Sequence, residues 1–122
     1  MSYSLSLTEE NTDGISNTFN QVLKVYASQT STDHVFSIYV LDSGSYTCGG
    51  IDGYGCVELD QIEWLANQTE FGDYGMLFTH FPLPEYIDAY NNYDYYGVKN
   101  DLVSCPSLNT GLFDMLKLKA NA

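Results

Sequence analysis

His80 is the side chain in this sequence with the clearest potential for chemistry. It lies near the end of the apolar run 76–81, which reads MLFTHF, and just before the loop 82–84, which reads PLP. In open α/β sheets, ligands gather beyond the carboxyl ends of the strands, and this pattern predicts such a position for His80. Histidine is the commonest metal ligand and a ready acid or base near neutral pH. A histidine at a strand end can also be purely structural, so the residues alone leave both interpretations open.

Asp42, Cys105 and His34 are weaker candidates. Asp42 follows the apolar run 35–41 and could be a ligand or a base, or it could simply cap the turn that follows. Cys105 could form a nucleophilic dyad with His80, but no third residue that would orient the pair is evident. His34 precedes the same apolar run, and we expect it at the surface.

No complete catalytic or metal-binding motif accompanies these candidates. The sequence has no Cys-x-x-Cys, His-x-x-x-His or His-Glu-x-x-His spacing, which argues against a closed zinc site. It has no Gly-x-Ser-x-Gly elbow, no glycine-rich phosphate loop with a lysine, and no acidic residues at calcium-loop spacing. The residue patterns therefore point to a position for chemistry without naming the reaction.

The cysteines bear on the compartment. Cys48 and Cys56 lie in the loop 44–55 and just after it, and this loop holds five glycines. The two cysteines could close a short disulfide in an oxidising compartment, which would leave Cys105 unpaired. The alternative is three free cysteines that behave as small hydrophobic residues. The segment 67–69 reads Asn-Gln-Thr, an N-glycosylation acceptor pattern, and it favours a secreted or lysosomal or vacuolar location.

The charge balance excludes several kinds of partner. The 122 residues include 16 Asp and Glu against 4 Lys and no Arg, and the formal net charge is −12. Nucleic-acid binding needs clustered Lys and Arg, so we expect no nucleic-acid partner. An arginine fork for phosphate is equally missing, so metal ions or backbone amides would have to supply positive charge to any bound anion. No apolar window approaches a membrane span, and no signal peptide is evident.

The apolar patterns predict a single continuous α/β piece. We expect strands over 2–7, 35–41 and 76–81, the second of them buried on both faces of a parallel sheet. We expect helices over 15–26, 59–69 and 109–119, because apolar residues recur there at helical spacing. Strands and helices in this order are typical of an α/β layer architecture. The stretch 85–96 holds five tyrosines, which could cover the edge of a core or offer a platform for sugars.

Three segments together resemble a known family. They are Leu41–Tyr46 (LDSGSY), Phe78–Tyr86 (FTHFPLPEY) and Asn109–Phe113 (NTGLF), in one order and at plausible distances. They resemble the middle of calcineurin-like metallophosphoesterases, in the branch related to purple acid phosphatases. Gly-Tyr-Gly at 53–55 and the residues Gln61 and Trp64 are also similar to that branch. The resemblance covers most of the chain, and the segment that contains His80 is its most specific part.

The resemblance implies a fold and an activity. It implies a layered α/β/β/α sandwich with a pair of divalent metal ions, of the Fe, Zn or Mn type, between its two sheets. In that family the metals polarise a phosphoryl group and generate hydroxide to hydrolyse phosphate esters. The histidine that matches His80 is a metal ligand there, so the resemblance implies a metal-binding role for His80. Metal charge would also account for the missing arginine.

The departures from the family pattern are as informative as the match. The pattern needs Asp-x-His, Gly-Asp and Gly-Asn-His-Asp/Glu segments before this region and Gly-His-x-His after it, and none is present. We therefore expect residues 1–122 to be an interior portion of one phosphoesterase domain. Such a portion would be inactive alone, would need the remaining parts of the domain as its partner, and would be poorly soluble or oligomeric. The alternative is a non-catalytic acidic binding or structural module derived from the same fold.

Overall fold

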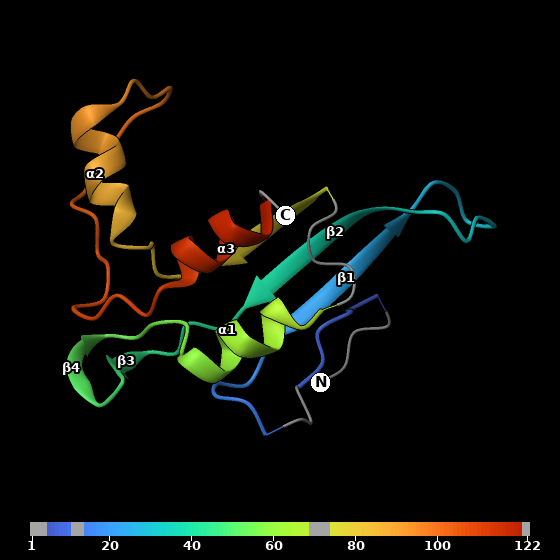
Figure 1. The fold of residues 1–122 in the computed structure, drawn as a ribbon, viewed down its shortest axis with the longest axis horizontal. Helices are drawn as coiled ribbons and strands as arrows, with labels where there is room; N and C mark the ends of the chain where they lie inside the picture. Colours follow the sequence, from blue (N-terminus) through green and yellow to red (C-terminus); the bar gives the residue numbers. More distant parts are fainter. Residues whose placement is uncertain (1–4, 11–13, 69–73, 121–122) are drawn as a thin grey trace.

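The computed structural model describes residues 5–10, 14–68 and 74–120 (Figure 1). Eight elements follow one another along the chain. They are β1 (Gln21–Tyr26), β2 (His34–Leu41), β3 (Tyr46–Cys48), β4 (Ile51–Tyr54), α1 (Leu59–Ala66), β5 (Gly75–Thr79), α2 (Glu85–Asn92) and α3 (Leu112–Ala120). None of the described helices is long and apolar enough to cross a membrane.

The main sheet has three strands in the order β1-β2-β5. β1 runs antiparallel to β2, whereas β5 runs parallel to β2 with Leu41 opposite Thr79. The carboxyl ends of β2 and β5 therefore lie side by side at one edge of the sheet. The prediction that β2 is buried on both faces is wrong. Ser37, Tyr39 and Leu41 are buried, but the side chains between them are partly exposed, because helices cover only one face.

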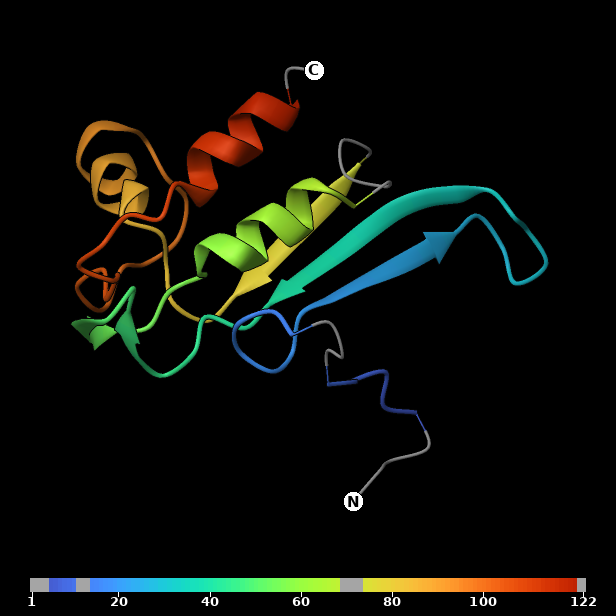
Figure 2. The same ribbon diagram turned by 60° about the horizontal axis from the view of Figure 1, so that its bottom comes forward.

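The helices α1 and α3 lie on the same side of the main sheet (Figure 2). The core between these layers joins Tyr39 and Leu41 of β2 to Ile62 and Leu65 of α1 and to Leu112 of α3. Apolar residues three and four positions apart fall on one face of a helix, which is why α1 and α3 bury one stripe each. The described residues thus confirm a mixed α/β arrangement, whereas the sandwich implied by the resemblance stays a prediction.

Two of the expected elements differ in the structure. The prediction of a helix over 15–26 is wrong, because the second half of that segment is strand β1. Val22 and Val25 are β-branched and favour a strand, and pairing with β2 satisfies the backbone of β1. The strand expected over 2–7 does not form at residues 5–7, and residues 1–4 lie outside the described residues.

The other predicted helices and strands are confirmed with shifted ends. The helix expected over 59–69 is α1, and the helix expected over 109–119 is α3. Within these helices Leu59 and Leu118 lie at the surface, with 64% and 74% of their surfaces exposed. The strand expected over 76–81 is β5, which ends one residue before His80.

The glycine-rich loop contains a two-stranded hairpin, β3–β4, which the sequence analysis did not predict. Gly49 and Gly50 form its turn with φ of 56° and 79°, values that favour glycine. Cys48 and Cys56 form the disulfide that was one of the two open alternatives, and Cys105 is a free, half-buried thiol. The tyrosine-rich stretch contains α2, which has no buried residue.

Candidate functional site

Asp42 and His80 occupy matching positions at the carboxyl edge of the main sheet. Each follows the last residue of its strand, and those last residues, Leu41 and Thr79, are partners in the parallel register. The loops beyond the two strands are joined as well, because Ser43 Oγ accepts a hydrogen bond from the Phe81 amide at 3.1 Å. The sequence therefore located His80 correctly at the end of a strand. It also placed Asp42 correctly at the end of a strand, which is β2 in the structure.

His80 is exposed and has few interactions. Its ring meets the ring of Phe81 edge to face, with 4.9 Å between the centroids. Within the described residues, the one group of three side chains that could jointly hold a metal is Cys48, Cys56 and Glu58. That group does not include His80, and its two sulfur atoms are joined in a disulfide. The described part of the chain therefore gives His80 no set of co-ligands.

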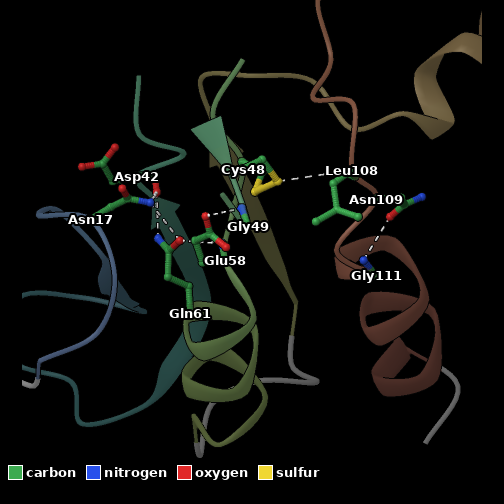
Figure 3. The surroundings of a disulfide bond; sticks show 10 residues. Asn17, Asp42, Cys48, Gly49, Glu58, Gln61, Leu108, Asn109 and Gly111 are labelled. Atoms are coloured by element: carbon green, nitrogen blue, oxygen red, sulfur yellow. Dashed lines mark hydrogen bonds between the residues drawn. A yellow bond between two sulfur atoms is a disulfide. The ribbon is translucent and has the colours of Figure 1, made fainter. Parts of the chain in front are cut away.

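Asp42 caps the turn after β2, which was the second of the two roles considered for it. One carboxylate oxygen accepts the Gly44 amide at 2.9 Å, and the other accepts the Thr18 amide at 3.0 Å. Its backbone carbonyl accepts hydrogen bonds from the side-chain amides of Asn17 and Gln61 (Figure 3). A carboxylate engaged in two backbone hydrogen bonds holds local structure and is poorly placed to act as a base.

Gln61 lies at the centre of a buried amide network that the sequence analysis did not anticipate. Its side chain is fully buried. Its Nε2 donates to Asn20 Oδ1 at 2.6 Å and to the Asp42 carbonyl at 2.7 Å. Its Oε1 accepts from Asn17 Nδ2 at 3.0 Å and from the Glu58 amide at 2.7 Å. All four hydrogen-bonding positions of this amide are therefore used within the chain.

Local backbone geometry places Asn17 in this network. Asn17 has a φ of 61°, in the left-handed region that Asn tolerates better than most residues. Gly44 faces it, and a Cβ atom at Gly44 would lie 2.9 Å from Asn17 Oδ1. Gln61 is held by the start of α1, where Glu58 and Gln61 form a reciprocal capping box. The spacing of Glu58 and Gln61 is a sequence signal for this helix start, and so for where the Gln61 side chain lies.

Asp60 ties the segment before β1 to α1. Its carboxylate accepts the Ser16 amide at 2.7 Å and the Gln61 amide at 2.8 Å. Burial raises the pKa of Asp60, but hydrogen bonds from Ser16 and Gln61 outweigh it and hold the pKa below the usual 3.8. Asp60 is thus an ionised structural group at neutral pH.

The disulfide lies beside this network (Figure 3). The amide of Gly49, in the hairpin turn, donates to Glu58 Oε1 at 3.0 Å. The sulfur of Cys48 lies 3.8 Å from the carbonyl oxygen of Leu108, in the segment that leads to α3. The Cys48–Cys56 bond therefore fastens the β3–β4 hairpin to the segment that begins α1, and the Cys48 sulfur contacts the segment before α3.

The other two candidates, His34 and Cys105, form no site with His80 in the described structure. His34 begins β2 and is half-buried, in place of the surface position expected for it. Its Nε2 lies 2.9 Å from Ser37 Oγ and 3.1 Å from the Phe36 carbonyl oxygen. Ser37 is fully buried, so its hydroxyl cannot contact a substrate. Among the described residues, Cys105 has no hydrogen bond to His80 that would support a dyad.

A groove of about 570 Å³ lies between β5, α2 and α3, close to the same edge of the sheet. Its lining is mostly apolar and includes Leu77, Leu83 and Leu116. Thr79 Oγ1 and Glu85 Oε2 also belong to groove residues, and they are the buried side-chain atoms that lack a hydrogen-bond partner in the described structure. The groove has the size and composition of a small-molecule pocket, but it is open.

The amino-acid sequence of this chain is similar to the sequences of two named plant proteins. The chain is 25% identical over 122 residues to the probable inactive purple acid phosphatase 14 of Arabidopsis thaliana. It is 27% identical over 119 residues to the probable inactive purple acid phosphatase 29 of the same plant. Each alignment covers 85% of this chain. These similarities support a relation to the purple acid phosphatases.

The coverage of these relatives limits what the similarity shows. The chain spans only about 30% of the length of the two curated relatives. No protein-family model matches the chain, and no solved structure matches it. The activity, substrate and partners of a complete protein are therefore matters for proposal.

Proposed function

We propose that this chain is part of a phosphoesterase domain related to purple acid phosphatases and that it does not hydrolyse phosphate esters by itself. The observation that carries the proposal is the isolation of His80. This residue stands exposed at the carboxyl edge of the sheet, and no described group of potential ligands includes it. The names of both curated relatives, which call them probable inactive phosphatases, also support it.

The donor set does not fit a two-metal centre. Two metal ions need several histidine and carboxylate ligands, and the described residues supply only His80 in a position suited to that role. Asp42, its neighbour at the sheet edge, is committed to the Gly44 and Thr18 amides. We therefore assign no step of a metal-dependent reaction to this chain. The proposed role of His80 is that of one ligand in a site completed by the remaining parts of such a domain.

A non-catalytic acidic module is the second candidate function. The closed amide network around Gln61 favours it, because amides with every position satisfied leave nothing at that strand end to bind or activate a substrate. The net charge of −12 would suit a partner with a basic surface. The reading frame around this segment discriminates the two. An upstream Asp-x-His and a downstream Gly-His-x-His in frame would favour the phosphoesterase domain.

A zinc titration followed by NMR tests the role of His80, because the chain has only two histidines. We expect the His80 imidazole signals to shift only at millimolar zinc, since a single imidazole binds a metal weakly. The signals of half-buried His34 should stay in place and serve as the internal control. Saturation of His80 at micromolar zinc would show a complete metal site in this chain and would overturn the proposal.

A further inference from the structure

Two cysteines and a glutamate meet between the β3–β4 hairpin and the start of α1. Cys48 ends β3, Cys56 lies just after β4, and Glu58 is the N-cap residue of α1. Their two sulfur atoms and a carboxylate oxygen all lie within 4.8 Å of one another (Figure 3). We call these three residues the Cys–Cys–Glu cluster.

The backbone before α1 places Cys56 and Glu58 on the same side of the chain. Glu58 is extended, with φ and ψ of −76° and 163°, and residues two positions apart in an extended segment point the same way. Val57, between them, packs into the hydrophobic core instead. The antiparallel hairpin then returns the chain so that Cys48 lies opposite Cys56. The three ligand groups therefore converge because of the local backbone and the hairpin.

Contacts other than the disulfide hold this cluster in place. The Gly49 amide donates a hydrogen bond to Glu58 Oε1 at 3.0 Å, which fixes the carboxylate against the hairpin turn. Gly55 packs directly on the loop after β2, since a Cβ atom at Gly55 would lie 2.3 Å from the Ser43 carbonyl oxygen. The position of the segment that leads into Cys56 is thus set by backbone packing. The arrangement does not rest on the sulfur–sulfur bond alone.

We propose that the Cys–Cys–Glu cluster binds one Zn²⁺ ion when its disulfide is reduced. A dithiol reductant supplies two electrons and two protons, so that the sulfur–sulfur bond breaks and two thiols form. Zinc then displaces the two thiol protons and bonds to both sulfurs and to a Glu58 oxygen. Two thiolates on one zinc lie roughly 3.8 Å apart, which side-chain rotation reaches in cysteines whose Cα atoms are 5.3 Å apart.

The surroundings of the cluster fit this ion in coordination number and in softness. The Leu108 carbonyl oxygen lies 3.8 Å from the Cys48 sulfur, so this oxygen or a water molecule beside it completes a tetrahedral site. Two thiolates select zinc over hard ions such as Mn²⁺. The net charge of −12 also raises the local concentration of cations. The site is separate from His80, and the proposal does not depend on the proposed function.

Cobalt binding by the Cys105→Ser chain tests the proposal. Charge-transfer absorption from thiolate to Co²⁺ reports sulfur ligands directly, and the substitution removes the free thiol as a competitor. With a phosphine as reductant, we expect one Co²⁺ per chain with two thiolate ligands, displaced by Zn²⁺ but not by Mn²⁺. The oxidised chain should show no such band. Zinc should also raise the melting temperature of the reduced chain, because a ligand bound to the folded state stabilises it.

A pair of glutamate variants tests the third ligand. Glu58→Gln should weaken zinc binding to the reduced chain at least about tenfold, the low end of what even an outer-shell partner contributes. Glutamine keeps an acceptor oxygen for the capping box, so α1 should still begin at the same place. Glu63→Gln is the matched control, since Glu63 lies exposed on the same helix. The control should leave zinc binding unchanged.

Three results would overturn the proposal. The first is the absence of the charge-transfer band in the reduced Cys105→Ser chain. The second is a full two-thiolate band after Cys48→Ser or Cys56→Ser in the same background. The third is equal zinc affinity of Glu58→Gln and Glu63→Gln, which would leave two cysteines without the glutamate. Should Glu58→Gln fail to fold, as judged by circular dichroism, Glu58→Asp repeats the comparison with a shortened carboxylate and the same expected weakening.

Discussion

At the scale of single residues, His80 differs from its neighbours at the carboxyl edge of the sheet. Its side chain is exposed, whereas Asp42 and Gln61 hold local structure. His80 extends from the end of β5 without polar partners among the described hydrogen bonds. Asp42, at the matching end of β2, accepts two backbone amides. Gln61 fills the space behind Asp42 with four hydrogen bonds. Of Asp42, Gln61 and His80, only His80 is therefore left available to a ligand within the described residues.

Replacement of Gln61 by alanine should cost about 2–4 kcal/mol of unfolding free energy. The change removes four hydrogen bonds from a buried site, those to Asn17, Asn20, the Asp42 carbonyl and the Glu58 amide, and the loss of buried hydrogen bonds is costly. Chemical denaturation followed by tryptophan fluorescence measures this loss, since Trp64 lies on the same helix. Gln68→Ala is the control, because the described structure shows one hydrogen bond from the Gln68 side chain, to the Trp64 carbonyl. Equal losses for the two variants would contradict the central place of Gln61.

Asp60 should make stability depend on pH in the acid range. Its pKa is lower in the folded chain than the usual 3.8, so its contribution is present above about pH 4 and is lost as pH falls through the folded pKa. The difference in stability between the wild-type chain and Asp60→Asn should therefore shrink on acidification. Its size should stay below about 1 kcal/mol, because Asp60 is partly solvent-screened. A difference that grows below pH 4 would contradict the assignment.

Some of these residue roles could be read from the sequence and others could not. The position of His80 followed from an apolar run that ends before a Pro-Leu-Pro loop, and both signals are local. Asp42 had two possible roles, and only the Gly44 and Thr18 amides distinguished them. The buried network of Gln61 was missed because two of its partners, Asn17 and Asn20, lie 44 and 41 residues away in sequence. Burial of a polar side chain depends on such long-range packing, which periodicity does not report.

At the scale of elements, segments with a strong local sequence pattern were predicted correctly as helix or strand, and segments with a mixed pattern were not. The segments that became β2, β5, α1 and α3 have continuous apolar runs or clear helical spacing. The segment before β2 has apolar residues at helical spacing, but it forms strand β1. Antiparallel pairing with β2 satisfies its backbone hydrogen-bonding groups. The hairpin β3–β4 escaped prediction because its strands have only three and four residues. Tertiary pairing decided both cases.

The disulfide should stabilise the arrangement of the hairpin, α1 and the segment before α3. Cys48 and Cys56 are eight positions apart, and closing a loop of this length contributes about 2–3 kcal/mol. Reduction, or replacement of both cysteines by serine, should lower the free energy of unfolding by that amount. Cys105→Ser is the matched control, since Cys105 is a free thiol. The prediction fails if a reductant leaves the melting temperature of the Cys105→Ser variant unchanged.

At the scale of the whole molecule, the chain is an α/β layer pair with helices on one face of its sheet. One face of the sheet meets α1 and α3 in the core, whereas no described helix covers the other face. The sequence predicted the α/β class from the order of its elements. It could not predict which face would stay open, because that depends on how β1 and β5 align with β2. The relation to inactive purple acid phosphatases likewise came from similarity and not from the site's geometry.

Hydrolysis of a phosphomonoester by the purified 122-residue chain tests the central claim most directly. The assay compares the wild-type chain with His80→Ala and His34→Ala, each with added zinc, iron or manganese. We predict no turnover above the metal-only blank for any of the three chains, because His80 lacks co-ligands in the described residues. Turnover by the wild-type and His34→Ala chains that is abolished in His80→Ala would contradict the account, since it would demonstrate a complete metal site around His80.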